Sequence, residues 1–274
     1  MTKELMARCK KYNFNDELIN LMNGAEGMFE LLREPKHKQY TMLDIKKWWL
    51  KLSTYVMSYI HGMYDKFIQM LELIKFNKED ELYILGDIFD RGNKPIDILD
   101  YIISHKNIHL ILGNHEDMFL DWYNYGNYSW ISYNGGDTTL KQLQEYQMKS
   151  NINYMEAVAQ YIKRLPLYKI IEINNQKYVL VHSRIEIPKE ETNIKDLLSG
   201  QTKDTLIWDR NISNDIKFKD YTIIQGHTPV QLIDNNNNGS IIKRNGHIYI
   251  DCGACFNNGR LGCLRLDDLK EFYV

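Results

Sequence analysis

The sequence predicts an α/β fold, and two observations predict it. From Tyr55 onward, short apolar runs with strand character alternate with stretches whose apolar residues recur at helical spacing. Polar side chains that bind metals stand at the ends of several strand-like runs, as they do where ligands bind beyond the carboxyl ends of strands. With 274 residues, the chain is long enough for one large domain with an appendage.

The elements follow one another in a regular order. Strands are expected at 55–60, 81–87 and 108–114, with helices at 66–74 and 95–105 between them. This β-α-β-α-β order is typical of a sheet whose strands are joined by helical crossovers. A helical, tyrosine-rich middle follows over about 116–168, and strands return at 168–173, 177–183, 221–227 and 247–253.

Residues 1–52 are expected to form a helical N-terminal extension, and residues 53–274 the main domain. The stretch NDELINLMNGAEGMFELLRE carries apolar residues at helical spacing, and TMLDIKKWWLKL opens with Thr41 and Asp44 in a capping-box arrangement. The sequence leaves open whether this extension docks on the main domain, pairs two protomers or binds a partner.

Composition excludes several classes of function. The 34 Lys and Arg nearly balance the 36 Asp and Glu, so nothing global predicts a nucleic-acid partner. No apolar stretch is long enough to span a bilayer and the first residues lack a signal-peptide core, which predicts a cytoplasmic protein. The cysteines are too few for a disulfide framework, and Cys252, Cys255 and Cys263 are interpreted as core thiols rather than a zinc or redox site.

Five predicted strands each end on a residue of a metal-binding type. The residues at these strand ends are His61, Asp87, Asn114 with His115, His182 and His227. One such histidine is more often structural, but five strands with the same feature favour a metal site. Imidazole, carboxylate and carboxamide donors suit Mn, Fe, Zn or Co better than a metal that prefers thiolates.

Five motifs resemble one family. GDIFDRG (86–92), GNHE (113–116), VHS (181–183), WDR (208–210) and GHTPV (226–230) occur in order and at familiar spacings. The chain resembles the calcineurin-like metallophosphoesterases of the phosphoprotein phosphatase type, above all the small bacterial and phage serine/threonine phosphatases and the related dinucleoside tetraphosphatases. The resemblance implies two mixed β-sheets packed as a sandwich and flanked by helices.

The resemblance also implies a ligand set for two metal ions. Asp87 is expected to bridge the ions, His61 to belong to the first site, and Asn114, His182 and His227 to complete the second. Manganese is the first candidate, with Fe, Zn and Co as alternatives. Two adjacent ions of this kind clamp a phosphoryl group and activate a water for attack.

The remaining roles follow from the same motifs. His115 is expected to be the general acid that protonates the leaving oxygen, with Asp90 orienting its ring. Arg91 and Arg210 are expected to bind the phosphate oxygens, as guanidinium groups do in bidentate contacts. Glu116 is interpreted as a helix N-terminal carboxylate rather than a catalytic group.

The chain departs from the family at one ligand. The first motif is Asp-x-His, but here the segment is Tyr59-Ile60-His61-Gly62. A neutral phenol is a poor ligand for a divalent ion, although a trivalent iron binds phenolate. We therefore expect the first metal to be weakened or lost while the second site keeps its four ligands. Asp65 is the one nearby carboxylate that would replace the missing ligand, and its position a helical turn away argues against it.

Two classes of function follow from these observations. The first is a metal-dependent phosphohydrolase, with phosphoserine or phosphothreonine proteins as the first candidate substrate, dinucleoside polyphosphates as the second and small phosphate monoesters as the third. The second is a phosphate-binding module of the same fold that has lost most turnover because of Tyr59. Retention of the four residues implied in catalysis favours the enzyme, and no membrane or nucleic-acid partner is expected.

Two further features carry expectations. Arg184, where relatives have a small residue, is expected to point into solvent rather than into the cleft. The aromatic segment 122–136 (WYNYGNYSWISYNGG) offers stacking surfaces for a base or peptide, but we expect it to form a helical cap over the core.

Overall fold

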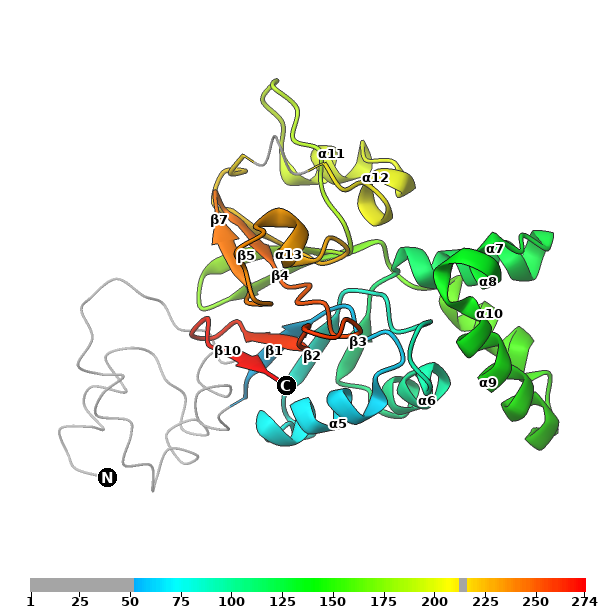
Figure 1. Cartoon of the computed structure of the whole chain (residues 1–274). Coiled ribbons are helices and arrows are strands. Elements are labelled where there is room, and N and C mark those ends of the chain that lie inside the picture. Colours follow the sequence, from blue (N-terminus) through cyan, green and yellow to red (C-terminus); the bar gives the residue numbers. More distant parts are fainter. Residues whose placement is uncertain (1–51, 212–215) are drawn as a thin grey trace, which may run out of the picture. The chain divides into compact units, whose positions relative to one another are not determined.

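The computed structural model describes residues 52–211 and 216–274 (Figure 1). The helices expected in the N-terminal extension lie outside the described residues, so both they and the boundary after residue 52 stay predictions. Ser53–Val274 form one structural unit.

The first of two five-stranded sheets has the order β10-β9-β1-β2-β3. Its strands are β1 (Thr54–Met57), β2 (Glu81–Ile84), β3 (Ile108–Leu110), β9 (Gly262–Arg265) and β10 (Glu271–Tyr273). β1, β2 and β3 run parallel, whereas β9 is antiparallel to β1 and β10. Parallel neighbours require crossovers, and α5 (Tyr64–Leu73) and α6 (Pro95–Ser104) provide them as the sequence predicts.

The second sheet has the order β4-β5-β6-β8-β7. Its strands are β4 (Tyr168–Ile173), β5 (Gln176–Val181), β6 (Tyr221–Gln225), β7 (Ile242–Arg244) and β8 (His247–Tyr249). β5, β6 and β8 are parallel, and β4 and β7 are antiparallel edge strands. Both sheets are therefore mixed, which confirms the predicted fold class.

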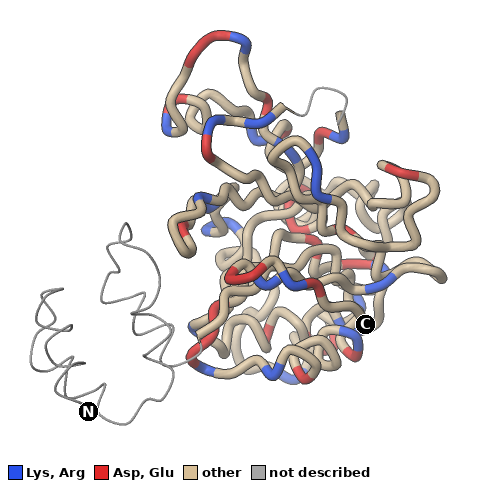
Figure 2. Tube along the Cα trace, turned by 90° about the vertical axis from the view of Figure 1, so that its left-hand side faces the viewer, with Lys and Arg blue, Asp and Glu red and all other residues tan. Residues whose placement is uncertain are grey.

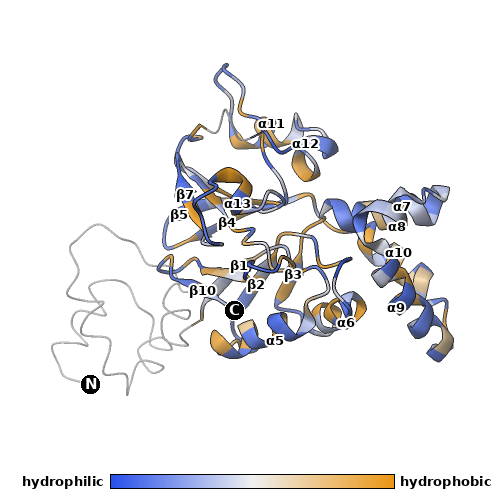
Figure 3. Cartoon of the chain, in the orientation of Figure 1, coloured by the Kyte–Doolittle hydropathy of each residue, from blue (hydrophilic) through white to orange (hydrophobic). Residues whose placement is uncertain are grey.

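Strand alternation sets the layers of the molecule. Val56 packs in a cluster with Leu180 and Ile224 of the second sheet, so this core lies between the two sheets. Tyr55 and Met57 point to the other face of the first sheet and pack in the cluster that contains the apolar sides of α5 and α6. Figure 3 shows hydrophobic and hydrophilic residues on different sides of these two helices. The result is the predicted sandwich flanked by helices.

The other helices lie in two groups. The chain between β3 and β4 forms α7 (Asn114–Tyr125), α8 (Ser129–Asn134), α9 (Gly136–Lys149) and α10 (Tyr154–Ile162), the green lobe of Figure 1. The short helices α11 (Ile194–Ser199), α12 (Lys203–Ile207) and α13 (Val230–Ile233) accompany the second sheet.

Basic and acidic residues are interspersed along the described trace (Figure 2). In the part of the chain that the structure describes, no helix is both long and apolar enough to cross a membrane.

Candidate metal and phosphate site

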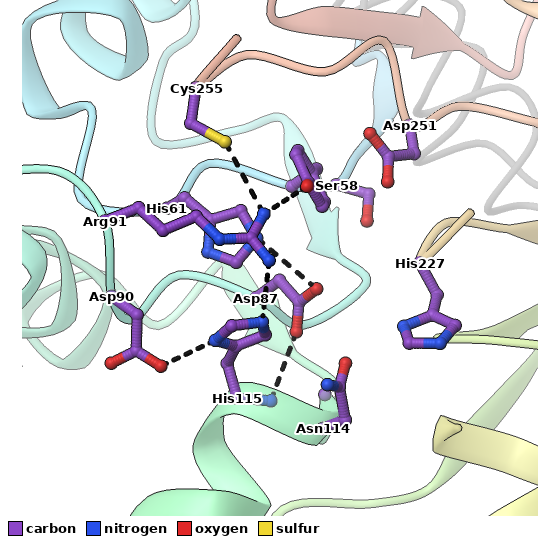
Figure 4. Close-up of polar contacts among 12 residues, drawn as sticks. Ser58, His61, Asp87, Asp90, Arg91, Asn114, His115, His227, Asp251 and Cys255 are labelled. Carbon is purple, nitrogen blue, oxygen red and sulfur yellow. Dashed lines mark hydrogen bonds and ion pairs between the residues drawn. The ribbon is translucent and has the colours of Figure 1, made fainter. Parts of the chain in front are cut away.

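The loops that follow five parallel strands bring the predicted site residues together. β1, β2 and β3 lead into the loops and helix start that carry His61, Asp87 and Asn114, and β5 and β6 lead to His182 and His227. Two groups of residues each bring potential ligand atoms within 4.8 Å of one another. The first group is His61, Asp87 and His115, and the second is Asp87, His182 and His227. The strand-end argument thus predicted the convergence, with Asp87 common to both groups (Figure 4).

Half of the described non-glycine residues with positive φ lie in the same loops. Six non-glycine site residues have φ between 44° and 71°: Tyr59, His61, Asp87, Asp90, Arg91 and His227. Such conformations cost on the order of 1 kcal/mol or more each and persist where the surrounding structure imposes them. Their clustering is typical of a functional site.

Close contact of two loops fixes part of this strain. Gly92 donates its N–H to His61 O at 2.9 Å, and a Cβ on Gly92 would lie 2.3 Å from that oxygen and 2.4 Å from Gly62 C. Glycine alone fits there. The GDIFDRG motif therefore ends in glycine because the β1 and β2 loops cross at this point.

His182 has a defined tautomer. Its Nδ1 lies 2.6 Å from Leu85 O, which can only accept, so Nδ1 carries the hydrogen. The lone pair of Nε2 then faces Asn114 Oδ1 at 2.9 Å, Asp87 Oδ1 at 3.4 Å and His227 Nδ1 at 3.2 Å. Burial lowers the pKa of His182 and that of His227, the latter to about 3, so both rings are neutral.

His61 repeats this arrangement at the first position. Its Nδ1 donates to Phe89 O at 2.7 Å, and its buried Nε2 has no hydrogen-bond partner among the described residues. Asp87 Oδ2 lies 3.6 Å from that Nε2. Burial lowers the pKa of His61 far below its ordinary value, so a neutral lone pair faces a carboxylate.

Acceptors that face one another without a donor are unfavourable when buried. A divalent cation resolves this conflict, and the mixed nitrogen and oxygen donors suit Mn, Fe, Zn or Co. The second position, with Asp87, Asn114, His182 and His227, fits such an ion. The first position fits less well, because Tyr59 replaces a carboxylate and burial raises the pKa of its phenol, which keeps it neutral.

His115 and Asp90 form a buried pair. His115 Nδ1 lies 2.6 Å from Asp90 Oδ2, and Thr139 Oγ1 and Trp130 Nε1 also donate to this carboxylate, each at 2.7 Å. Burial opposes protonation of His115, but Asp87 and the hydrogen bond to Asp90 outweigh it and raise the pKa of His115. This is the orientation that a proton donor at Nε2 requires.

Two arginines border the site. Arg91 donates from Nη1 to the Tyr59 hydroxyl, and its Nη2 lies 3.2 Å from His115 Nε2. Arg210 is exposed, and its Nε lies 3.1 Å from His227 Nε2. Each cation thus lies beside one group of ligand atoms, where an anionic substrate would approach.

Two acidic residues have positions that the motifs did not indicate. Glu116 does lie in the first turn of α7, as expected, but its carboxylate accepts N–H groups from Gly113 and from three residues of the β2 loop. Asp251 is buried with its Oδ1 on Gly253 N at 2.9 Å, while its Oδ2 lacks a hydrogen-bond partner in the described chain. In Figure 4 its carboxylate points toward Ser58. The strand end HIYID in the sequence was the available signal for Asp251.

Two expectations are corrected. Arg184 does not point into solvent: it is 7% exposed and donates to Asp209 Oδ2 at 2.8 Å, because the fold brings β5 against the segment after α12. Cys255 is not a core thiol: its Sγ lies 3.5 Å from Arg91 Nη1, whereas Cys252 and Cys263 are buried as expected.

The aromatic segment divides into two parts. Trp130 is buried and hydrogen-bonded to Asp90, which is the structural role that we expected. Tyr125, Tyr128 and Tyr133 are 82%, 68% and 86% exposed, so they do not close a cap over the core.

The family model for calcineurin-like phosphoesterases matches residues 52–253. The chain therefore belongs to this family of metallophosphoesterases, whose members are phosphohydrolases that use divalent metals. This confirms the family that the motifs indicated.

Similar proteins share one name. The symmetrical bis(5'-nucleosyl)-tetraphosphatase of Wigglesworthia glossinidia brevipalpis is 29% identical over 199 residues, which cover 71% of this chain and 62% of that protein. Its namesake from Buchnera aphidicola subsp. Acyrthosiphon pisum (strain Tuc7) is 42% identical over 67 residues, 24% of each chain. The chain thus spans less than two thirds of the length of these relatives.

Solved structures show the same fold. A crystal structure of a putative diadenosine tetraphosphatase has a TM-score of 0.52 at 16% identity and covers 81% of this chain and 92% of its own. A serine/threonine phosphatase from Saccharomyces cerevisiae has the same TM-score and identity and covers 78% and 72%. At such identities the likeness concerns the fold alone.

Proposed function

We propose that this chain hydrolyses a phosphorus–oxygen bond with a divalent ion held by Asp87, Asn114, His182 and His227. One observation carries the proposal: the buried, neutral rings of His182 and His227 converge with the Asp87 carboxylate, and Arg210 lies beside them. A bound ion supplies Lewis acidity that activates a water and offsets the charge of the phosphate. Manganese is the first candidate because the donors are nitrogen and oxygen.

The protein side chains bind the substrate and move the proton. Arg210 and Arg91 donate to phosphate oxygens, and His115 donates a proton from Nε2 to the leaving oxygen. Asp90 supports that step, because a carboxylate on Nδ1 keeps the ring protonated and correctly oriented near neutral pH.

The substrate class that we favour is a dinucleoside polyphosphate. The relatives above carry the name of such an enzyme. The exposed Tyr133 lies two residues before Gly135, whose carbonyl accepts the N–H of Arg91 at 3.2 Å. Aromatic rings joined so closely to a phosphate-binding residue offer a stacking surface for a base.

A phosphorylated protein is the second candidate. The WDR and GHTPV segments resemble those of small protein phosphatases, and Trp208 and Arg210 are both exposed beside His227. An open rim of this kind admits a side-chain phosphate on a larger partner. The third hypothesis is a phosphate-binding protein with little turnover, which Tyr59 favours. The same assay tests it.

The test compares diadenosine tetraphosphate with a phosphoserine peptide, each with added Mn²⁺. We expect cleavage of the dinucleotide, and a KM about 5- to 150-fold higher in Tyr133→Ala, the range of one lost base–aromatic stack of about 1–3 kcal/mol. Tyr133→Phe keeps the ring and serves as the matched control. Cleavage of the peptide alone would contradict the substrate class, and cleavage of neither would contradict the hydrolase.

A further inference from the structure

The guanidinium of Arg91 lies among the groups of the first metal position. Nη1 donates to the hydroxyl of Tyr59, the residue that replaces the family's carboxylate. Nη2 lies 3.2 Å from Nε2 of His115, which forms a group of potential ligand atoms with His61 and Asp87. Figure 4 shows the guanidinium beside the His61 ring and above Asp87 and His115.

Several contacts hold Arg91 in this place. Its own N–H donates to Gly135 O, and its backbone has a φ of 66°, which the crossing loops impose. Its Cζ lies 5.1 Å from the centroid of the Tyr59 ring, and Cys255 Sγ lies 3.5 Å from Nη1. The direction of the side chain is therefore set by the backbone and by the residues around it.

The charges of this position match a single fixed cation. An Asp-x-His motif would place a second carboxylate beside Asp87, but here Tyr59 stands at that position and its hydroxyl accepts from Arg91. The one remaining carboxylate is shared with the second position. A divalent ion entering here would have to displace Arg91 from Tyr59 and then lie beside its positive charge.

We propose that Arg91 takes the place of the first metal ion, so that the chain binds one divalent ion, at the second position. The proposal rests on the phosphohydrolase function above and specifies its metal content. A guanidinium has five N–H donors, and the three contacts to Tyr59, Cys255 and His115 use at most three of them. At least two N–H donors remain for phosphate oxygens. Arg91 therefore offers positive charge and hydrogen bonds at the place where the first ion would offer positive charge.

Asp251 is the competing source of a ligand. It is a buried carboxylate with an unpartnered oxygen in the described residues, and both Asp87 and Arg91 influence its pKa, which is raised mainly by burial. It belongs to neither of the two groups of converging ligand atoms found there. Arg91 has direct contacts at the first position, whereas in the described chain Asp251 acts on Tyr59 only through its charge and has no hydrogen bond to His61, Asp87 or His115.

The experiment counts Mn²⁺ ions bound per full-length chain, by electron paramagnetic resonance titration and by metal analysis after gel filtration. We expect one ion for the wild type and one for Tyr59→Phe, which keeps the ring but supplies no ligand. Tyr59→Asp is expected to bind two ions, because it restores a carboxylate. Asp251→Asn, with circular dichroism to verify folding, is expected to retain one.

Specific counts would overturn the proposal. Two ions in the wild type would do so without any variant, and so would a count that falls when Asp251 becomes Asn. A folded Tyr59→Asp protein that still binds one ion would also contradict it, because the missing carboxylate would then not be what excludes the first ion. None of these counts depends on turnover, so a correct count with no hydrolysis would contradict only the proposed function.

Discussion

At the residue scale, the pair of His115 and Asp90 controls where a proton is held. Burial raises the pKa of Asp90, and the hydrogen bonds that it accepts from three donors, His115, Thr139 and Trp130, oppose this by favouring its ionised form. Its negative charge in turn favours the protonated form of His115, whose pKa is raised. The pair is buried, so solvent screens this attraction little.

Asp90→Asn should lower the pKa of His115, because the ring loses its anionic partner. Because the proposed mechanism uses protonated His115 as the acid, the basic limb of the pH–rate profile should move to lower pH, and kcat should fall about 10²- to 10³-fold. The stability that this group contributes is present below the unfolded pKa of about 6.5 and is lost as pH rises through the raised folded pKa. The stability gap between wild type and variant should therefore be widest at acidic pH.

Asp97→Asn is the matched control for that experiment. Asp97, which is half-buried, also accepts two side-chain hydrogen bonds, from Gln142 and Tyr146, but it lies outside the ligand groups. It should leave the pH–rate profile in place. An Asp90→Asn profile that superimposes on the wild-type profile would contradict the role of His115 as the proton donor.

At the scale of elements, one side chain of α7 organises the loop after β2. Glu116 Oε2 accepts N–H groups from Asp87 and Gly113 at 2.9 and 3.1 Å, and Oε1 accepts those of Ile88 and Phe89 at 2.9 and 3.1 Å. The side chain is fully buried. It therefore holds the backbone of the β2 loop, from which Asp87 extends, against the start of α7.

Glu116→Gln should destabilise the protein by about 3 kcal/mol or more. An amide has one acceptor oxygen, so its NH₂ group would face two of the four backbone N–H donors and leave them unpaired. Asp117→Asn on the next residue loses an ion pair with the half-exposed Lys203, and should cost less than about 1 kcal/mol. Urea denaturation of both variants measures the difference. Equal stability of the two would show that the four N–H contacts do not hold the loop.

At the scale of the whole molecule, the site joins the two sheets. The first sheet contributes Asp87 and Asn114, and the second contributes His182 and His227. His182 also donates across the sandwich to Leu85 O. An ion at the second position would therefore link the sheets and stabilise the folded state over the unfolded chain.

Mn²⁺ at about 100 times its dissociation constant should stabilise the protein by about 2.7 kcal/mol. For a unit of this size that corresponds to a rise of roughly 5–10 °C in the thermal midpoint, reversed by a chelator. Asp87→Asn is nearly isosteric but lacks the shared charge, and should show little or no shift. A full shift in that variant would place the ion elsewhere.

The sequence by itself determined the alternation of strands and helices and the end of the sheets at which the candidate ligand residues lie. Periodicity and strand ends are local properties, and parallel strands necessarily present their carboxyl ends at one edge. His61, Asp87 and His182 were identified on that basis. The substitution at Tyr59 was visible as well, because a spaced motif shows a missing member.

The tertiary structure decided what those side chains contact. Arg91 meets Tyr59 across 32 residues of sequence, Glu116 meets the β2 loop and Arg184 meets Asp209, and none of these pairings follows from spacing. They depend on how loops from different strands cross, with strained backbone at positive φ directing the side chains. The sequence thus identified the candidate site side chains. Packing between distant segments decided which groups these side chains contact and which protonation states they favour.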